Sequence, residues 1–481
     1  MPIRRSKILV TIGPASRAPE TLAAMVEAGV DGFRINASHG TADEWRSDAQ
    51  AIRKAAAHAG RPLAVVFDLC GPKLRLAASA PERRFEIGDA AQFGNRGDAI
   101  PVASDSFAAS VAPGRSQLVV GDGTPRFATQ SVEGGVVTAR CIRAGKIGPS
   151  KGLFVTQAEP TDDALTEKDL RDLDVAAEIA ADWVAQSFVR SEEDVRRCRA
   201  ELIRRGSAAR VIAKIEKLEA VENLDAILEV SDGVMVARGD LGIEAGVAQV
   251  PLLQKDILRR AAGAGRLAVT ATQMLESMLT SGEPTRAEAS DVANAVLDGT
   301  SALMLSGETA VGDHPIEAVL AMAEIALIAQ RAAPFQLDIT SVVRDNAEAV
   351  MRSAAHLAQQ ISAAALVIPT TTGGSARAAA KCRTPRSIIA ITRDQTVANQ
   401  LALEWGVLPG VAQANPGRID DLIDDAVETA REIGDLHPGD GVVVTYGQSA
   451  RITGGTDLIA VREVGSARPS GFETNPDKLR R

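Results

Sequence analysis

Short apolar segments of this chain repeatedly end in polar or charged residues spaced two positions apart. The clearest segment is 211–216, Val-Ile-Ala-Lys-Ile-Glu, which ends in Lys214 and Glu216. Side chains of a β-strand alternate between its two faces, so these two side chains would point the same way. Four further segments end in the same manner, in Arg34, Asn36 and Ser38, in Arg238 and Asp240, in Thr270 and Thr272, and in Ser306 and Glu308. Five such ends predict a single polar site built from the carboxyl ends of parallel strands.

The apolar segments alternate with amphipathic helical patterns, which is typical of parallel strands joined by right-handed crossovers. Eight segments fit this scheme: 7–12, 32–37, 63–69, 183–188, 211–216, 234–239, 267–272 and 302–306. Eight strands predict a closed (β/α)₈ TIM barrel, a fold whose active sites lie at the carboxyl ends of its strands.

Two other regions depart from this scheme. The alternation breaks at Gly71-Pro72, and short β-like segments without an amphipathic helix continue to about Val155. Beyond residue 339 a new series of strands and helices begins. We therefore predict a barrel domain, an inserted small β-barrel lid domain, a C-terminal open α/β domain and a tail. Their predicted ranges are 1–70 with 157–338, 71–156, 339–470 and 471–481.

Composition narrows the class of protein. The 481 residues are 45% hydrophobic and 24% charged, as in an ordinary globular protein, and the net charge of −9 argues against nucleic acid as the main partner. No apolar run reaches the length of about 18 residues that a membrane span needs. The cysteines show no metal-ligand spacing, which favours reduced thiols. We expect a cytoplasmic enzyme.

The strand ends carry residue types suited to metal and phosphate chemistry. Glu216 and Asp240 supply hard oxygen ligands that suit Mg²⁺ or Mn²⁺. Lys214 and Arg34 add positive charge for an anionic, phosphorylated substrate. The alternative is that Lys214 simply pairs with Glu216, and Arg238 with Asp240. The sequence holds neither a Walker loop nor a dinucleotide fingerprint.

Longer motifs make the chain resemble the pyruvate kinase family. The resemblance is dense from about residue 7 to residue 335 and looser in the insert and the last domain. It rests on Thr11-Ile-Gly-Pro-Ala-Ser16, Arg34-Ile-Asn-Ala-Ser-His-Gly40, Leu165-Thr-Glu-Lys-Asp169, Ser187-Phe-Val-Arg190, Ala213-Lys-Ile-Glu216, Met235-Val-Ala-Arg-Gly-Asp-Leu-Gly242, Ala271-Thr-Gln-Met-Leu-Glu-Ser277, Thr285-Arg-Ala-Glu288, Asp291-Val-Ala-Asn-Ala295 and Leu305-Ser-Gly-Glu-Thr309.

The resemblance implies the glycolytic reaction of phosphoenolpyruvate with ADP to give pyruvate and ATP. Lys214 would neutralise the transferring phosphoryl group, which Arg34 would contact. Gly239 N–H and Thr272 would hold the substrate carboxylate, with Thr272 also near the proton path. The implied metal ligands are Glu216 and Asp240, and the implied nucleotide-side residues are Asn36, His39, Arg75 and Lys151. A second Mg²⁺ would arrive with ADP.

One departure from the family concerns K⁺. Asn36, Ser38, Asp68 and the Leu69 carbonyl match the family's K⁺ site, yet Lys73 stands where K⁺-dependent members carry glutamate. This exchange changes the local charge by two units, so we expect an enzyme that needs no K⁺. The alternative is that Lys73 is a solvated surface lysine.

Regulation and assembly are also implied by the family. A loop in the last domain resembles the family's binding loop for sugar-phosphate activators, although an ordinary strand–helix turn would look the same. It comprises Thr371, Thr372, Gly373, Gly374 and Ser375. A homotetramer is expected from the family alone. The alternative function is a metal-dependent barrel lyase acting on pyruvate-like substrates, which would need no nucleotide lid.

Overall fold

The computed structural model describes residues 4–104, 106–121, 123–158, 163–332, 343–412, 419–447 and 455–465. The chain divides into two compact units. One comprises Met1–Phe335 with Asn399–Gly406, and the other comprises Gln336–Ala398 with Val407–Arg481. The tail predicted at 471–481 and the boundary predicted near residue 339 lie outside the described residues.

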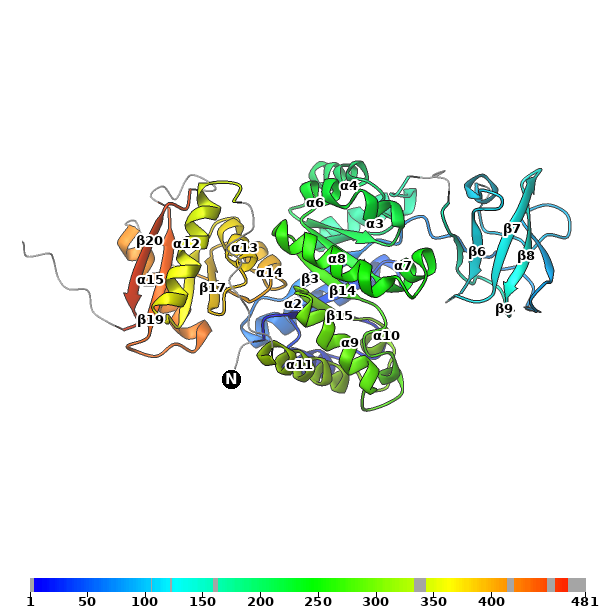
Figure 1. Ribbon diagram of the computed structural model, residues 1–481. Helices are drawn as coiled ribbons and strands as arrows, with labels where there is room; N and C mark the ends of the chain where they lie inside the picture. The colour runs from blue at the N-terminus through cyan, green and yellow to red at the C-terminus, as the bar shows by residue number, and fades with distance from the viewer. Residues whose placement is uncertain are drawn as a thin grey trace, which may run out of the picture. The chain divides into compact units, whose positions relative to one another are not determined.

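A closed barrel of eight parallel strands forms the centre of the first unit, and helices surround it (Figure 1). The strands pair around the barrel in the order β1-β15-β14-β13-β12-β11-β3-β2. Their bounds are β1 Lys7–Thr11, β2 Gly32–Asn36, β3 Ala64–Asp68, β11 Trp183–Gln186, β12 Arg210–Ile215, β13 Gly233–Ala237, β14 Leu267–Ala271 and β15 Ala302–Leu305. The predicted TIM barrel is therefore confirmed.

Helices connect the barrel strands, and several begin with a side-chain cap. Thr166 caps one such helix, because its hydroxyl accepts the Asp169 N–H while Asp169 reaches back to the Thr166 N–H. The helices of this unit are α1 Pro19–Glu27, α2 Ala42–Ala59, α3 Glu167–Glu178, α4 Glu192–Arg204, α5 Leu218–Glu222, α6 Leu224–Val230, α7 Arg238–Ala245, α8 Val250–Gly263, α9 Arg286–Leu297, α10 Gly307–Ala310 and α11 Pro315–Ala332.

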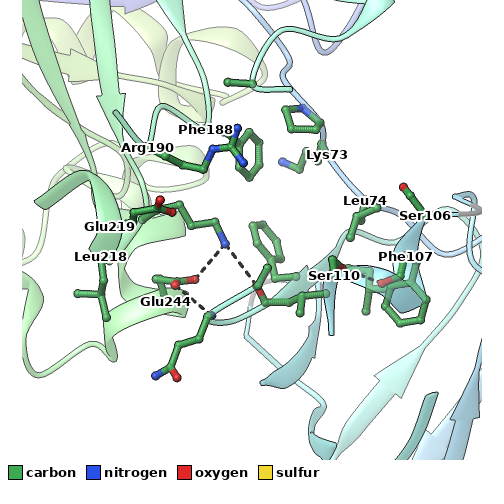
Figure 2. A pocket seen from close by; sticks show the side chains of 18 of the residues that line it. Lys73, Leu74, Ser106, Phe107, Ser110, Phe188, Arg190, Leu218, Glu219 and Glu244 are labelled. Atoms are coloured by element: carbon green, nitrogen blue, oxygen red, sulfur yellow. Dashed lines mark hydrogen bonds and ion pairs between the residues drawn. The ribbon is translucent and has the colours of Figure 1, made fainter. Parts of the chain in front are cut away.

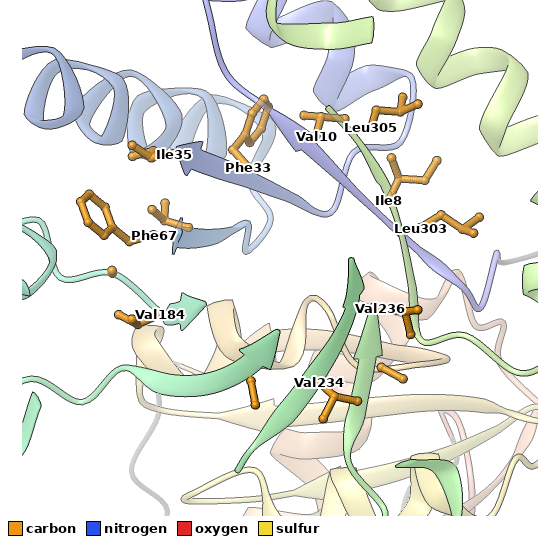
Figure 3. Packing of buried hydrophobic residues seen from close by; sticks show 14 of the residues in the cluster. Ile8, Val10, Phe33, Ile35, Phe67, Val184, Val234, Val236, Leu303 and Leu305 are labelled. Carbon is orange, nitrogen blue, oxygen red and sulfur yellow. The ribbon is translucent and has the colours of Figure 1, made fainter. Parts of the chain in front are cut away.

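The barrel has two cores because its strands alternate. Val10, Phe33 and Val234 point outward and pack beneath the helices, as Figure 3 shows for part of this layer. Their strand neighbours point inward and fill the barrel with a separate cluster that includes Leu9 and Trp183. Leu403, from the distant segment Asn399–Gly406, also belongs to the inner cluster.

The segment between β3 and α3 contains strands and one short 3₁₀ helix, Phe107–Ser110, among its described residues. Five strands form an antiparallel sheet in the order β10-β6-β7-β8-β5, and β4 pairs with β9. Phe85, Phe93 and Phe127 meet edge to face in its core. The strands are β4 Arg83–Phe85, β5 Ala90–Phe93, β6 Gln117–Val120, β7 Arg126–Glu133, β8 Val136–Arg143, β9 Gly145–Ile147 and β10 Leu153–Val155.

The second unit contains an open sheet in the order β18-β17-β16-β19-β20, in which only the β19–β20 pair is antiparallel. This agrees with the predicted open α/β domain. Its elements are α12 Asn346–Gln360, β16 Ala365–Pro369, α13 Gly374–Lys381, β17 Ser387–Thr392, β18 Val407–Val411, α15 Ile419–Gly434, β19 Gly441–Tyr446 and β20 Leu458–Glu463. A further helix, α14 Gln395–Leu401, spans the boundary between the units.

Candidate active site

Lys214 lies at the centre of a buried cluster at the carboxyl ends of the barrel strands. Its Nζ is 3.0 Å from Glu216 Oε1, 3.2 Å from Asp68 Oδ1 and 2.6 Å from Ser187 Oγ. Burial disfavours the charged amine, but Asp68 and Glu216 outweigh this effect and raise the pKa of Lys214. The side chain is therefore a permanent cation.

Asp68 bridges two cations. Arg34 Nε donates to Asp68 Oδ2 at 2.6 Å, and Lys214 lies beside the other carboxylate oxygen. Burial works against ionisation of Asp68, but Lys214 and Arg34 prevail and keep its pKa below the usual value. Arg34 also donates to Thr11 Oγ1 at 3.1 Å, so both ends of its guanidinium are held.

Ser187 contacts the same cluster, and its role was not predicted from the sequence. An ammonium group can only donate, so the Ser187 hydroxyl accepts from Lys214 and donates its own proton to the Leu69 carbonyl at 2.7 Å. The next residue, Phe188, donates its N–H to Glu216 Oε2 at 2.8 Å with a positive φ of 56°. The sequence signal was the motif 187–190, which carried only the family resemblance.

Glu216 and Asp240 fit a divalent cation. Burial raises the pKa of Glu216, and although Lys214 lowers it, the nearby charge of Asp240 raises it further. A cation between the two carboxylates would relieve this repulsion. Among the described residues, no group of three or more His, Cys, Asp or Glu side chains forms a metal site. Two carboxylates suit Mg²⁺, which keeps water and substrate oxygens as its remaining ligands.

Thr272 and Gly239 lie together on the other side of the site. Gly239, in the first turn of α7, donates its N–H to Thr272 Oγ1 at 3.0 Å. Thr272 and Gln273 both have positive φ, at 68° and 52°, a strained conformation that is found at functional sites. Arg238 stabilises this turn by donating to the Thr272 carbonyl at 2.6 Å.

The strand-end residues do not all meet. Arg238 pairs with Asp291 at 2.6 Å, so the alternative pairing with Asp240 is wrong. Thr270 lies on the outward face of β14, between the inward-facing Val269 and Ala271, and donates to Thr300 Oγ1 at 2.9 Å. Glu308 accepts the backbone N–H groups of Ser306 and Leu275, which is a structural role. By contrast, Lys214 and Glu216 point the same way, as predicted, and they also form the ion pair given as the alternative, at 3.0 Å.

The residues predicted to face the nucleotide come from the barrel and the β insert. Burial lowers the pKa of His39, and the charges of Arg75, Lys73 and Arg34 lower it further, so this histidine is held neutral. Arg75 Nη1 donates to the Ser150 carbonyl at 3.2 Å, and Lys151 Nζ donates to the Lys146 carbonyl at 2.9 Å. Both cations thus contact backbone of the insert.

The residues of the family K⁺ site have the following contacts. Asn36 Oδ1 accepts the Ser38 N–H at 3.1 Å, and Leu69 O accepts the Ser187 hydroxyl. Lys73 is exposed, and its ammonium lies 5.8 Å from the centre of the Phe154 ring. Its charge, after burial and the charge of Arg75, contributes to lowering the pKa of His39.

The predicted effector loop leads into α13 in the second unit, and Gly374 and Ser375 form the first residues of this helix. Gly373 caps this helix with a positive φ of 79°, and its N–H donates to Thr370 Oγ1 at 3.0 Å. The hydroxyl of Ser375 is 2.7 Å from that of Thr456. The loop has the left-handed glycine that such a turn needs.

Comparison with known proteins decides the family. Residues 3–319 match the model of the pyruvate kinase barrel domain, and residues 348–462 match that of the pyruvate kinase alpha/beta domain. The chain belongs to the pyruvate kinase family. A pyruvate kinase of Clostridium acetobutylicum is 36% identical over 96% of this chain and 100% of its own length. A pyruvate kinase of Mycobacterium tuberculosis is 37% identical over 96% of this chain and 99% of its own length. A pyruvate kinase of Geobacillus stearothermophilus is 36% identical over 97% of this chain and 82% of its own length.

Family membership confirms the resemblance that the motifs indicated, and the relatives match along nearly the whole chain. The pyruvate kinase barrel model covers both β3 and β12, which carry Asp68 and Lys214. Among the described residues, no helix has the length and apolar character of a membrane span.

Proposed function

We propose that this protein transfers the phosphoryl group of phosphoenolpyruvate to ADP, giving pyruvate and ATP. The observation that carries the proposal is the buried ammonium of Lys214, held by Ser187, Asp68 and Glu216 at the carboxyl ends of the barrel strands. Phosphoryl transfer needs mainly positioning and neutralisation of charge, and a fixed cation supplies both.

We assign the divalent metal to Glu216 and Asp240, as Mg²⁺ or Mn²⁺. When bound, the ion would polarise phosphoryl oxygens and neutralise charge. Lys214 would face the phosphoryl group as charge develops on it, and Arg34 would contact the same group from β2. Both cations are held by Asp68, so their separation is fixed before substrate arrives.

Gly239 and Thr272 form the proposed carboxylate subsite. In the structure the Gly239 N–H donates to the Thr272 hydroxyl. A bound substrate carboxylate would accept hydrogen bonds from both the Gly239 N–H and the Thr272 hydroxyl. Thr272 would also lie near the proton that the enolate acquires. Arg238, through its hydrogen bonds to the Thr272 carbonyl, is a positioning residue for this subsite.

The β insert between residues 71 and 156 would act as a lid. Arg75 and Lys151 lie on it and would reach the nucleotide, with Asn36 and His39 on the barrel side and a second Mg²⁺ carried by ADP. A lid that closes over the barrel mouth would exclude water from phosphoryl transfer.

We propose further that the enzyme needs no added K⁺. Lys73 is one of the cations whose charge lowers the pKa of His39, and Arg34 and Lys214 already pair with Asp68. A monovalent cation would therefore add little and would be repelled. Initial rates in tetramethylammonium buffer should be the same with and without KCl, and Lys73→Glu should create K⁺ dependence. Many-fold stimulation of the unmodified enzyme by K⁺ would show that Lys73 is only a surface lysine.

A coupled assay tests the reaction itself. Pyruvate and ATP should form together from phosphoenolpyruvate, ADP and Mg²⁺, with no pyruvate formed when ADP is omitted. Turnover of pyruvate-like substrates without nucleotide would instead identify a barrel lyase. The homotetramer and the sugar-phosphate effector at 371–375 remain predictions from the family, and the cytoplasmic location remains a prediction from the composition.

A further inference from the structure

A cavity of about 540 Å³ lies between the β insert and the barrel, where two connecting segments join them. Its lining includes residues of both connectors, at 72–74 and 153–158, and residues that follow β11 and β12. None of the four residues proposed to face the nucleotide lines it. The volume falls in the usual range for small-molecule sites of about 300–1,000 Å³.

Side chains of the barrel hold both connectors in place. Asp169 accepts the Gly71 N–H at 3.1 Å on the first connector. On the second connector, Lys217 Nζ contacts the Val155 carbonyl at 3.3 Å and Glu244 at 3.0 Å, while Glu244 accepts the Gln157 N–H at 3.1 Å. A molecule in the cavity would therefore touch residues of both connectors, and also Lys217 and Glu244, which hold the second connector.

Two cations meet at one end of the cavity. In Figure 2, Lys73 from the first connector and Arg190 from the barrel extend toward each other beside the Phe188 ring. Among the described residues, no carboxylate lies within ion-pair distance of Lys73. The Arg190 guanidinium pairs loosely with Asp194, at 3.6 Å. This end of the cavity has an excess of positive charge.

The remaining walls carry both apolar and charged side chains. Phe107, Phe154 and Leu153 face the cavity from the insert, and Leu218 faces it from α5. The exposed carboxylates of Glu219 and Glu222 also line it. Arg115, Lys217 and Glu244 line the cavity as well, and Lys217 pairs with Glu244 at 3.0 Å. Glu219 and Glu222 would repel an anionic group placed beside them, so the charged group of a ligand would lie at the Lys73 end.

We propose that this cavity binds a small organic anion with an aromatic or branched apolar body, and that the bound anion ties the lid connector to the barrel. The charged group would bridge Lys73 and Arg190, and the body would lie against Phe154. The site is separate from the proposed substrate and nucleotide contacts, and its occupancy does not require phosphoryl transfer. Binding would restrict hinge movement and so act on a lid-dependent reaction at a distance.

Calorimetry on the full chain without substrates tests the site with three probes. The probes are 3-phenylpropionate, phenyl phosphate and the neutral 3-phenylpropan-1-ol. At least one of the anions should bind tenfold or more tightly than the alcohol. The comparison of carboxylate with phosphate shows which anion the two cations accept. Equal binding of all three probes would overturn the proposal.

Two variants locate the anion. Lys73→Met and Arg190→Gln should each weaken anion binding about tenfold, since a charge-assisted hydrogen bond is lost. The matched control is Lys255→Met, an exposed lysine on α8, which should bind as the unmodified protein does. Arg190→Gln removes the pair with Asp194 and can disturb the fold, whereas Lys73 forms no ion pair with any residue in the described part of the chain. Unchanged affinity in Lys73→Met would refute the site.

Two further measurements separate this site from the catalytic one. The bound anion should slow hydrogen exchange of backbone amides in 73–76 and 153–158, while ADP with Mg²⁺ and phosphoenolpyruvate should not displace it. Displacement by either substrate would mean that the cavity is part of the substrate site and would end the proposal. These experiments measure anion binding and hydrogen exchange, so their outcome does not depend on whether the protein catalyses phosphoryl transfer.

Discussion

Replacing Lys214 with methionine probes the buried charge cluster most directly. The ammonium lies 3.0 Å from Glu216 and 3.2 Å from Asp68, and both carboxylates are only 1% exposed. Methionine fills a similar volume without a charge. The variant therefore leaves two buried carboxylates and removes the cation between them.

The loss of stability follows from these distances. At an effective dielectric constant of about 20, each contact is worth about 5 kcal/mol of gross Coulomb attraction. Desolvation offsets much of this, and removing one partner of a buried pair costs about 3–5 kcal/mol net. Asp68 keeps Arg34 at 2.6 Å, so most of the loss arises at Glu216, whose pKa is already raised. We expect a free energy of unfolding lower by about 3–5 kcal/mol without divalent metal.

Mg²⁺ should recover part of this loss, because it would restore a cation beside Glu216. The stabilisation by Mg²⁺ should thus be larger in Lys214→Met than in the unmodified protein. The kcat should fall by about 10³-fold or more, as for other cations that act on the transferring phosphoryl group. The affinity for phosphoenolpyruvate should change much less, because the opposed charge develops during transfer.

Urea denaturation in EDTA and in MgCl₂ gives the stabilities, and steady-state kinetics gives kcat and the apparent affinity. Lys255→Met serves as the control for loss of a lysine that is exposed and distant from the cluster. Equal stabilisation of both proteins by Mg²⁺ would contradict the shared role of Lys214 and the metal at Glu216. A fall in affinity alone would make Lys214 a ground-state anchor.

Three more predictions follow from other contacts. Glu216→Gln and Asp240→Asn should each abolish most turnover while circular dichroism shows an intact fold, and a near-normal rate at saturating Mg²⁺ would refute the metal assignment. Lys151→Ala should weaken the use of ADP more than that of phosphoenolpyruvate in steady-state assays, whereas equal losses would mean that it only supports the insert. Burial raises the pKa of Asp182 from 3.8 to about 6, so the folded protein keeps a proton that the unfolded chain has lost, and the free energy of unfolding should fall as the pH rises through this range. The difference from Asp182→Asn should change by on the order of 3 kcal/mol across it, and a flat difference in urea denaturation would contradict the raised pKa.

Much of the barrel could be predicted because its strands obey a strict period of two. Leu9 fills the interior while Val10 packs under the helices, and the same alternation places Lys214 and Glu216 on one side. The capping pair Thr166 and Asp169 marks a helix start with purely local chemistry. Strand alternation and helix capping depend on residues that are close in the sequence, so they can be predicted from the sequence alone.

Partner choice between distant side chains could not be predicted in this way. Arg238 was a candidate partner of Asp240, yet it binds Asp291 because α9 brings that carboxylate to the end of β13. Ser187 reaches Lys214 only because β11 and β12 pair in register, with Gln186 beside Ala213. The inward position of Leu403 depends on a segment almost a hundred residues beyond the last barrel strand. These contacts arise from the packing of segments that are distant in the sequence, so neither the alternation of side chains nor the composition predicts them.

The proposed hinge and the proposed metal ligand share the same short loops, which would couple the position of the lid to the metal site. Phe188 donates to Glu216 through its backbone, and its ring packs where a side chain at Gly71 would clash, with a Cβ–Cδ2 distance of only 2.6 Å. Lys217, which contacts the Val155 carbonyl, directly follows Glu216 in the chain. A rotation of either connector must therefore move a residue that is bonded or adjacent to Glu216. Closed and open lids should differ in the environment of this carboxylate, so that anything that restrains the hinge also acts on the metal site.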